Sequence, residues 1–167
     1  MRIVFRRQAT YAESLCSFPE LCLCQMDVEE RVAAMGVFTD EELSYLRSQR
    51  MARLATASSS GMPDVAAVTF SIDGDAVISG GYDITKTVRY GNLLKNPRAV
   101  IVIDDLVAVD PWTPRGVKVR GAAALEEHNE LLRIRITPEV IWSWGINTDG
   151  AEKRFRNVER RDVAPGA

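Results

Sequence analysis

Residues 51–79 read MARLATASSSGMPDVAAVTFSIDGDAVIS, and this stretch predicts three consecutive β-strands. The first strand is expected at 51–57 and the second at 65–72, because the cluster of serine, glycine and proline between them is typical of a turn. The third strand, 76–79, follows Asp73-Gly74, a pair suited to a tight hairpin. The stretch therefore predicts an antiparallel meander.

Two helices are expected on either side of this meander. Thr39 and Glu42 form a capping box, which predicts a helix that begins there and runs toward Gln49. A second, shorter helix is expected at about 87–95. It ends before Pro97, because proline cannot continue a helix.

Four further strands are expected downstream, at 98–104, 117–121, 132–136 and 140–145. The first of them has apolar residues at four consecutive positions, 100–103, which predicts burial on both faces of the sheet. The segment 110–116 is expected to be a rigid, proline-rich loop. Six or seven short, mostly antiparallel strands with a few short helices favour a closed or split β-barrel, since closure removes exposed strand edges.

Composition indicates a soluble protein with one main domain. The chain has 167 residues, of which 46% are hydrophobic and 26% are charged. Its formal net charge of -2 argues against nucleic-acid binding, which normally requires a basic excess. No apolar run approaches the roughly 18 residues of a membrane span, so we expect a cytoplasmic protein with no membrane and no nucleic-acid partner.

The domain is expected at residues 35–147, between an N-terminal extension at 1–34 and a charged, frayed tail at 148–167. The extension holds all three cysteines and has no sustained hydrophobic period, so it predicts neither a disulfide framework nor a packed domain. It is interpreted either as a disordered or loosely docked extension, or as the product of a start codon assigned too early, with Met26 or Met35 as the true first residue.

Side chains that could carry catalysis unaided are scarce. His128 is the only histidine and lies in a polar run, so it is expected to be an exposed turn residue. A zinc site or a serine–histidine–aspartate triad is hard to build from this chain, and no metal is expected. A protein without a nucleophile–base pair must bind passively or take its chemistry from a cofactor.

The stretch 79–98, SGGYDITKTVRYGNLLKNPR, is the most specific in the chain, because it runs from a strand through two glycines into a helix. Unpaired backbone N–H groups in the first turn of a helix attract anions. Lys86, Arg89 and the hydroxyl of Thr85 or Thr87 could complete a phosphate site there. The alternative is a basic surface helix capped by threonine.

The segment 91–99, GNLLKNPRA, resembles the motif K-x-R-N-L-x-x-N-P-R of the pyridoxamine 5′-phosphate oxidase-like superfamily. Residues 53–56, 61–63 and 68–70 resemble the opening hairpin of that family. The segments 104–105, 110–121, 136–138 and 142–146 resemble its actinobacterial branch, which uses coenzyme F420. The similarity spans about residues 36–146.

The resemblance implies a homodimeric split β-barrel of the FMN-binding type, with a cofactor in a groove at the dimer interface. The phosphate-binding lysine of the family falls on Arg89, and the arginine two places later falls on Gly91, which is a departure that Lys86 would have to offset. The cofactor-binding residues expected from the resemblance and the motif are Lys86, Thr87, Arg89, Tyr90, Asn92, Val68, Thr69, Phe70 and Trp112.

The function that this implies is an F420-dependent oxidoreductase, in which reduced deazaflavin delivers hydride to a small unsaturated organic acceptor. The alternatives are an FMN-binding oxidase of the same fold and a non-catalytic F420- or flavin-binding protein. No catalytic side chain is assigned, and a proton could come from water, Tyr82 or Tyr90.

The tryptophans and two arginines of the later strands have separate interpretations. Trp112 is expected to cover the cofactor or to form a substrate wall, whereas Trp144 is expected to pack in the core or an interface. Arg133 and Arg135 share one strand face and are interpreted as solvated or interface charges rather than ligands.

Overall fold

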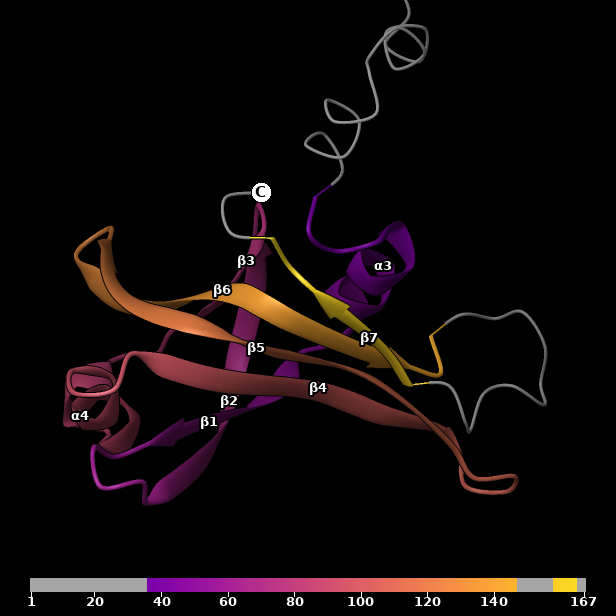
Figure 1. Ribbon diagram of the computed structural model, residues 1–167, viewed down its shortest axis with the longest axis horizontal. Coiled ribbons are helices and arrows are strands. Elements are labelled where there is room, and N and C mark those ends of the chain that lie inside the picture. The colour runs from indigo at the N-terminus through magenta and orange to yellow at the C-terminus, as the bar shows by residue number, and fades with distance from the viewer. Residues whose placement is uncertain (1–35, 147–157, 165–167) are drawn as a thin grey trace, which may run out of the picture. The chain divides into compact units, whose positions relative to one another are not determined.

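The computed structural model describes residues 36–146 and 158–164, and these form an antiparallel barrel with short helices (Figure 1). In chain order the elements are α3 (Asp40–Ser48), β1 (Met51–Ala57), β2 (Pro63–Asp73), β3 (Ala76–Ser79), the 3-10 helix η1 (Ile84–Lys86), α4 (Val88–Leu93), β4 (Arg98–Ala108), β5 (Thr113–His128), β6 (Leu131–Trp144) and β7 (Val158–Asp162). The predicted meander and both predicted α-helices are confirmed.

The barrel closes because β6 pairs back onto β3. The strands follow the order β3-β2-β1-β4-β5-β6 and neighbouring strands are antiparallel. Residues 134–136 of β6 pair with 77–79 of β3. The other half of the same β6 edge, residues 140–144, pairs with β7. Six strands thus form the wall and a seventh extends it, which confirms the mostly-β split barrel.

A bulge lets β5 and β6 stay paired along almost their whole length. Arg120 pairs with Val140 and Gly121 pairs with Pro138, so Glu139 has no residue opposite it. A Cβ atom built on Gly121 would lie 1.8 Å from the carbonyl oxygen of Thr137, so only glycine fits this position. Pro138 is tolerated in the strand because a bulge does not need its missing N–H group.

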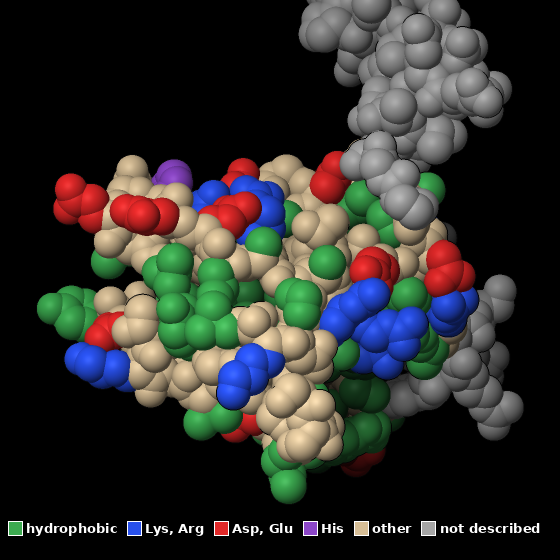
Figure 2. Space-filling view, turned by 60° about the vertical axis from the view of Figure 1, so that its left-hand side comes forward, with side chains coloured by type: hydrophobic (Ala, Val, Ile, Leu, Met, Phe, Trp, Pro, Cys, Tyr) green, Lys and Arg blue, Asp and Glu red, His purple; other side chains and the backbone are tan. Residues whose placement is uncertain are grey.

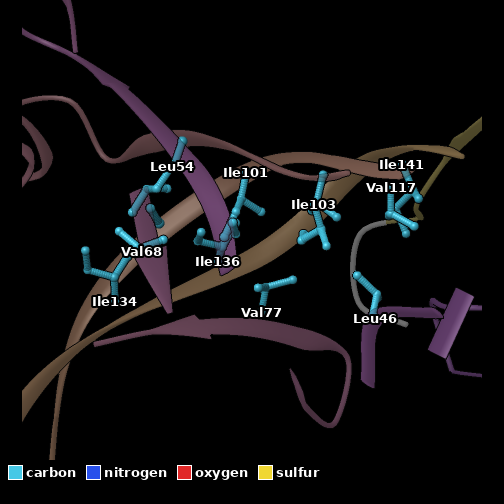
Figure 3. Close-up of a cluster of buried hydrophobic side chains, with 14 of the residues drawn as sticks. Leu46, Leu54, Val68, Val77, Ile101, Ile103, Val117, Ile134, Ile136 and Ile141 are labelled. Atoms are coloured by element: carbon cyan, nitrogen blue, oxygen red, sulfur yellow. The ribbon is translucent and has the colours of Figure 1, made fainter. Parts of the chain in front are cut away.

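Alternate residues of the strands fill the barrel. The buried cluster takes side chains from β1 to β6 and from α3, and Figure 3 shows them pointing toward one another. On β4 the inward residues Ala99, Ile101 and Ile103 are buried, whereas Val100 and Val102 face outward and are only half-buried. The prediction that 100–103 is buried on both faces of the sheet is therefore wrong for Val100 and Val102, which lie on the outer face.

The C-terminal part of the described chain is tied to α3. Arg161 on β7 donates from Nη2 to Glu42 Oε2 at 2.7 Å and to the carbonyl oxygen of Val37 at 2.7 Å. Glu42 is buried, and its carboxylate also accepts the backbone N–H of Thr39 at 3.0 Å, which confirms the predicted capping box. The prediction of a frayed tail is wrong for Val158–Asp162, because strand pairing and this ion pair hold it.

Strand bounds differ from the prediction where tertiary pairing overrides local signals. The proline-rich segment 110–116 was expected to be a loop, yet β5 already begins at Thr113. The two strands expected at 132–136 and 140–145 are one strand, because the bulge carries β6 through Pro138. The N-terminal extension at 1–34 lies outside the described residues. Within them, no helix is long and apolar enough to span a bilayer.

Candidate functional site

Arg89, in the first turn of α4, has an unused hydrogen-bonding group. Its Nε atom is buried and has no hydrogen-bond partner among the residues that the structure describes. Its Nη2 atom lies 3.7 Å from the position that a Cβ atom at Gly81 would take. Gly81 therefore lies next to a guanidinium that has one N–H donor without a hydrogen-bond partner.

The turn between β3 and α4 is held by its own side chains. Thr87 caps α4, since its Oγ1 accepts the N–H of Tyr90 at 3.3 Å. The carboxylate of Asp83 accepts the N–H of Thr85 at 3.1 Å, and hydrogen bonds from Thr85 and then Lys86 lower the pKa of Asp83. Lys86 forms an ion pair with Asp83 at 2.9 Å, and its side chain is 84% exposed. The ammonium group therefore pairs with Asp83 and does not add a second cation beside Arg89.

A groove of about 420 Å³ begins at the same glycines. It is lined by Thr69, Phe70, Ser71, Ile78, Gly80, Gly81, His128, Leu131, Leu132 and Arg133. In Figure 2 the purple side chain is His128, and hydrophobic side chains gather in the hollowed surface below it. Gly81 contributes to the groove and lies next to the Arg89 guanidinium, so a cationic side chain and an apolar groove adjoin.

The structure brings together some of the predicted site residues. Thr69 and Phe70 line the groove together with Gly80 and Gly81. Val68 precedes these two residues on β2, and its side chain is buried in the core, so it is not available to a ligand. Tyr90 packs partly buried against the core.

Asn92 has a different position from the one predicted. It is buried, and its Nδ2 donates to Thr56 Oγ1 on β1 at 3.0 Å. Asn96 similarly donates to the carbonyl oxygen of Ala57 at 3.2 Å. Both amides therefore attach α4 and the turn after it to β1, which is a positioning role rather than a ligand contact.

Trp112 does not share a site with Arg89 within one chain. It lies in the turn after β4, whereas α4 precedes the first residue of β4, and Figure 1 places the two at opposite ends of that strand. Eleven residues of β4, at about 3.3 Å each, separate them by roughly 33 Å. Its side chain is 56% exposed.

The groove wall formed by the β5–β6 hairpin was not predicted. Asn129 and Glu130 have positive φ angles of 50° and 63°, the conformation of a two-residue hairpin turn, and this turn brings His128 and Leu131 to the groove. The available signal for this turn was Asn129 in the polar run 126–130, which lies between two segments of alternating apolar residues. His128 is exposed, as expected, but it is not remote from the site.

Arg133 and Arg135 form an ion-pair network beside this wall. Arg135 contacts Glu126 and Asp73 at 2.6 Å each, and Arg133 contacts Glu126 at 3.2 Å. Arg135 is held by its two ion pairs and does not line the groove, in agreement with its interpretation as a paired charge. Arg133 does line the groove. Trp144 is half-buried and packs against Gly116, outside the cluster of core residues.

No cluster of three or more metal-ligating side chains occurs within 36–146 and 158–164. The groove offers apolar side chains such as Phe70 and Leu131 and the backbone groups of Gly80 and Gly81, and the guanidinium of Arg89, a group that suits an anion, lies next to Gly81. This combination fits a phosphate-bearing, flavin-like cofactor, because such a molecule has an anionic tail and a planar ring system. The fold and site together define a cofactor-binding split barrel.

Comparison with known proteins gives the family. The model of the pyridoxamine 5′-phosphate oxidase family matches residues 38–154. A 5a,11a-dehydrotetracycline/5a,11a-dehydrooxytetracycline reductase of Streptomyces rimosus is 36% identical over 122 residues, which cover 67% of this chain and 86% of the relative. The chain therefore belongs to the pyridoxamine 5′-phosphate oxidase family, actinobacterial branch.

Solved structures agree with the barrel. The conserved hypothetical protein Rv2991 from Mycobacterium tuberculosis has a TM-score of 0.56 at 20% identity, covering 66% of this chain and 87% of its own. An F420 reductase has a TM-score of 0.50 at 20% identity, covering 62% of this chain and 98% of its own. At these identities the likeness concerns the fold. The kinship with a curated reductase supports an oxidoreductase with a flavin-like cofactor and a small-molecule substrate.

Proposed function

We propose that the protein is an F420-dependent oxidoreductase that transfers hydride between reduced deazaflavin and a small unsaturated organic acceptor. The observation that carries the proposal is the position of Arg89: its Nε is buried without a hydrogen-bond partner among the described residues, and its Nη2 lies 3.7 Å from the Cβ position of Gly81, which lines the apolar groove. An arginine with unpaired donors binds a phosphate through two parallel hydrogen bonds, which a surface cation with a carboxylate partner cannot do as well.

In this proposal Arg89 and the backbone of Gly80 and Gly81 hold the phosphate, while Thr69 and Phe70 contact the ring. The bound deazaflavin supplies the hydride, and the protein supplies position and an apolar environment. Lys86 stays with Asp83, and Thr87 and Asn92 act by fixing α4. The proton that completes reduction of a double bond comes from solvent or from a side chain at the groove.

The choice of F420 over FMN is supported by the branch of the family to which the chain is similar. Its curated relative reduces an unsaturated organic molecule, and an F420 reductase shares the fold. FMN is the other candidate, because the family takes its name from a flavin-type oxidase. Protein purified from a host that makes flavins but no F420 should be colourless under our proposal and yellow under the alternative.

The test is a titration of Arg89→Ala with F420 and FMN in parallel. Loss of a charged hydrogen bond should weaken F420 binding by about 1.5 to 3 kcal/mol, roughly a 10- to 150-fold rise in Kd. Lys95→Ala is the matched control, since Lys95 is exposed at the far end of α4 and its removal changes net charge equally. Equal affinity of the wild-type protein and Arg89→Ala for both cofactors would remove Arg89 from the site.

The non-catalytic alternative is separated by a second measurement. Reduced F420 bound to the wild-type protein should be oxidised by at least one member of a panel of quinones and unsaturated lactones. Tight binding without turnover of any acceptor would favour a binding protein. The proposal also includes a homodimer in the cytoplasm, as the resemblance implied, and size-exclusion chromatography with light scattering measures the oligomeric state.

A further inference from the structure

The groove has two walls, and each has an arginine. One wall comes from β2, β3 and the glycine turn, with Arg89 next to Gly81. The other wall is the β5–β6 hairpin, and Arg133 is one of its groove-lining residues. The cofactor site proposed above uses Arg89 and leaves Arg133 without a role.

Arg133 shares two carboxylates with Arg135, and Arg135 holds them more closely. The Nε of Arg135 lies 2.6 Å from Glu126 Oε1, and its Nη2 lies 2.6 Å from Asp73 Oδ2. The contacts of Arg133 are longer, at 3.2 Å from Nε to Glu126 Oε2 and 3.4 Å from Nη2 to Asp73 Oδ2. A contact of 3.4 Å is beyond the usual range of a hydrogen bond. Arg135 therefore keeps both carboxylates paired without help from Arg133.

Arg133 has N–H donors that these contacts leave unused. A guanidinium has five N–H groups, and the contacts with Glu126 and Asp73 engage two of them. The remaining three have no hydrogen-bond partner within 36–146 and 158–164, and the nitrogen atoms that carry them are not sealed from solvent. The side chain of Arg133 is only 21% exposed. Water therefore competes less for an anion bound there than at a fully exposed arginine.

The hairpin wall places this cation beside an apolar surface. Arg133 and Leu131 are two positions apart on β6, so their side chains share one face of the strand. Ile78 of β3 lies opposite Arg135 and therefore shares the same face. In Figure 2 basic and acidic side chains lie beside the purple His128, above the hydrophobic hollow. A ligand that fits this wall has an apolar body and an anionic end.

We propose that Arg133 binds an anionic oxygen group of the acceptor, so that the acceptor class is unsaturated organic acids, with a carboxylate on a conjugated apolar body. The carboxylate accepts the unused N–H groups of Arg133, and the apolar body lies against Ile78 and Leu131. Arg133 then determines which acceptors the groove selects. This inference rests on the proposed function, because it names the substrate class of the same groove.

The phosphate of the cofactor is the other anion that can reach this groove. In the proposed site Arg89 and the backbone of Gly81 already hold that phosphate. Arg133 lies on the other wall, where two carboxylates are its neighbours. The two assignments predict different losses, because removal of a phosphate partner weakens the cofactor and removal of a carboxylate partner weakens the acceptor.

The experiment measures cofactor and acceptor affinity separately by calorimetric titration. The probes are cinnamate and sorbate, each paired with its methyl ester, which has the same conjugated body without the charge. The protein is titrated as purified and after loading with oxidised F420, which has no hydride to give. Wild-type protein should bind each acid at least about tenfold more tightly than its ester, as a charged hydrogen bond implies.

Arg133→Ala should remove this preference. The Kd of each acid should rise about tenfold or more, while the Kd of the esters and of F420 should not change. The variant should keep the wild-type unfolding midpoint, because Arg135 still pairs both carboxylates. Arg133→Lys should keep part of the preference, since an ammonium keeps the charge but not the paired donors.

Two variants serve as controls. Arg98→Ala removes the same charge from an exposed ion pair with Glu139, outside the groove, and should leave every Kd unchanged. Arg89→Ala should weaken F420 and keep the preference for acids, the reverse of Arg133→Ala.

Equal affinity of the wild-type protein for acids and esters, or a preference that survives in Arg133→Ala, would overturn the inference. The proposed function would stand, since F420 binding is measured in the same samples. A rise in the Kd of F420 for Arg133→Ala with an unchanged preference would assign Arg133 to the phosphate and would also overturn the inference. Wild-type protein that binds neither F420 nor FMN would overturn the proposed function, whereas the titrations of the protein as purified decide on Arg133 independently.

Discussion

Gly121→Ala should unfold much of the barrel, because the β5–β6 bulge has no room for one additional carbon atom. The new Cβ would lie 1.8 Å from the carbonyl oxygen of Thr137, 2.8 Å from the Thr137 carbonyl carbon and 3.1 Å from the backbone nitrogen of Glu139. These are backbone atoms of the partner strand, so no side-chain rotation relieves the clash. The two longest strands must separate at the bulge.

The expected cost exceeds ordinary overpacking. Forcing one extra methyl into a well-packed core typically costs about 1 to 3 kcal/mol. Here the strand bonds next to the bulge are also lost, so we expect a loss of at least about 4 kcal/mol in the free energy of unfolding, a large part of the roughly 5 to 15 kcal/mol of a typical domain.

Urea unfolding followed by tryptophan fluorescence measures this loss, since Trp142 and Trp144 lie on β6. Gly91→Ala is the matched control: a Cβ atom there meets nothing within 4 Å, and alanine in a helix should raise the free energy of unfolding by about 0.5 to 1 kcal/mol. A Gly121→Ala protein as stable as wild type would refute the argument that the bulge requires glycine.

Two further predictions concern polar groups outside the groove. Burial, and then the charge of Asp105, raise the pKa of Tyr45 far above its ordinary value of 10.0. Below pH 10 the phenol is neutral in both the folded and the unfolded chain, and at higher pH the unfolded chain ionises first, so the free energy of unfolding falls. Urea titrations at about pH 8 and pH 11 should show a smaller fall for Tyr45→Phe than for wild type. Arg161→Ala leaves the buried Glu42 without its cation and should cost about 1.5 to 3 kcal/mol, with faster proteolytic cleavage near β7. Arg160→Ala loses an exposed pair with Asp162 and a contact over the Trp142 ring at 5.9 Å, so it should cost less, about 0 to 1 kcal/mol.

The sequence predicted those parts of the fold that depend on neighbouring residues. Asp73-Gly74 and the Thr39 capping box act over three or four positions, and the structure has both where they were expected. The bulge could not be predicted in the same way, because Pro138 is compatible with β6 only when Gly121 lies opposite. Local signals therefore divided one strand into two.

The candidate site was predicted in part for a similar reason. Arg89 lies in a motif that includes its own turn, so the motif was sufficient to select it. Trp112 was assigned to the same site, although its distance from Arg89 depends on the length of β4. His128 was predicted to be an exposed turn residue because its neighbours are polar, and it is exposed; its place at the groove depends on the pairing of β5 with β6, which local signals do not show.

The two asparagine amides that join α4 to β1 determine how a ligand would meet this protein. Asn92 bonds to Thr56 and Asn96 to Ala57, so the short helix that carries Arg89 is anchored at two points to a strand of the closed wall. A receptor built in this way has little freedom to adjust to its ligand. Association should then be a single-step encounter whose rate rises linearly with ligand concentration, and selectivity should depend on the shape of the arriving molecule.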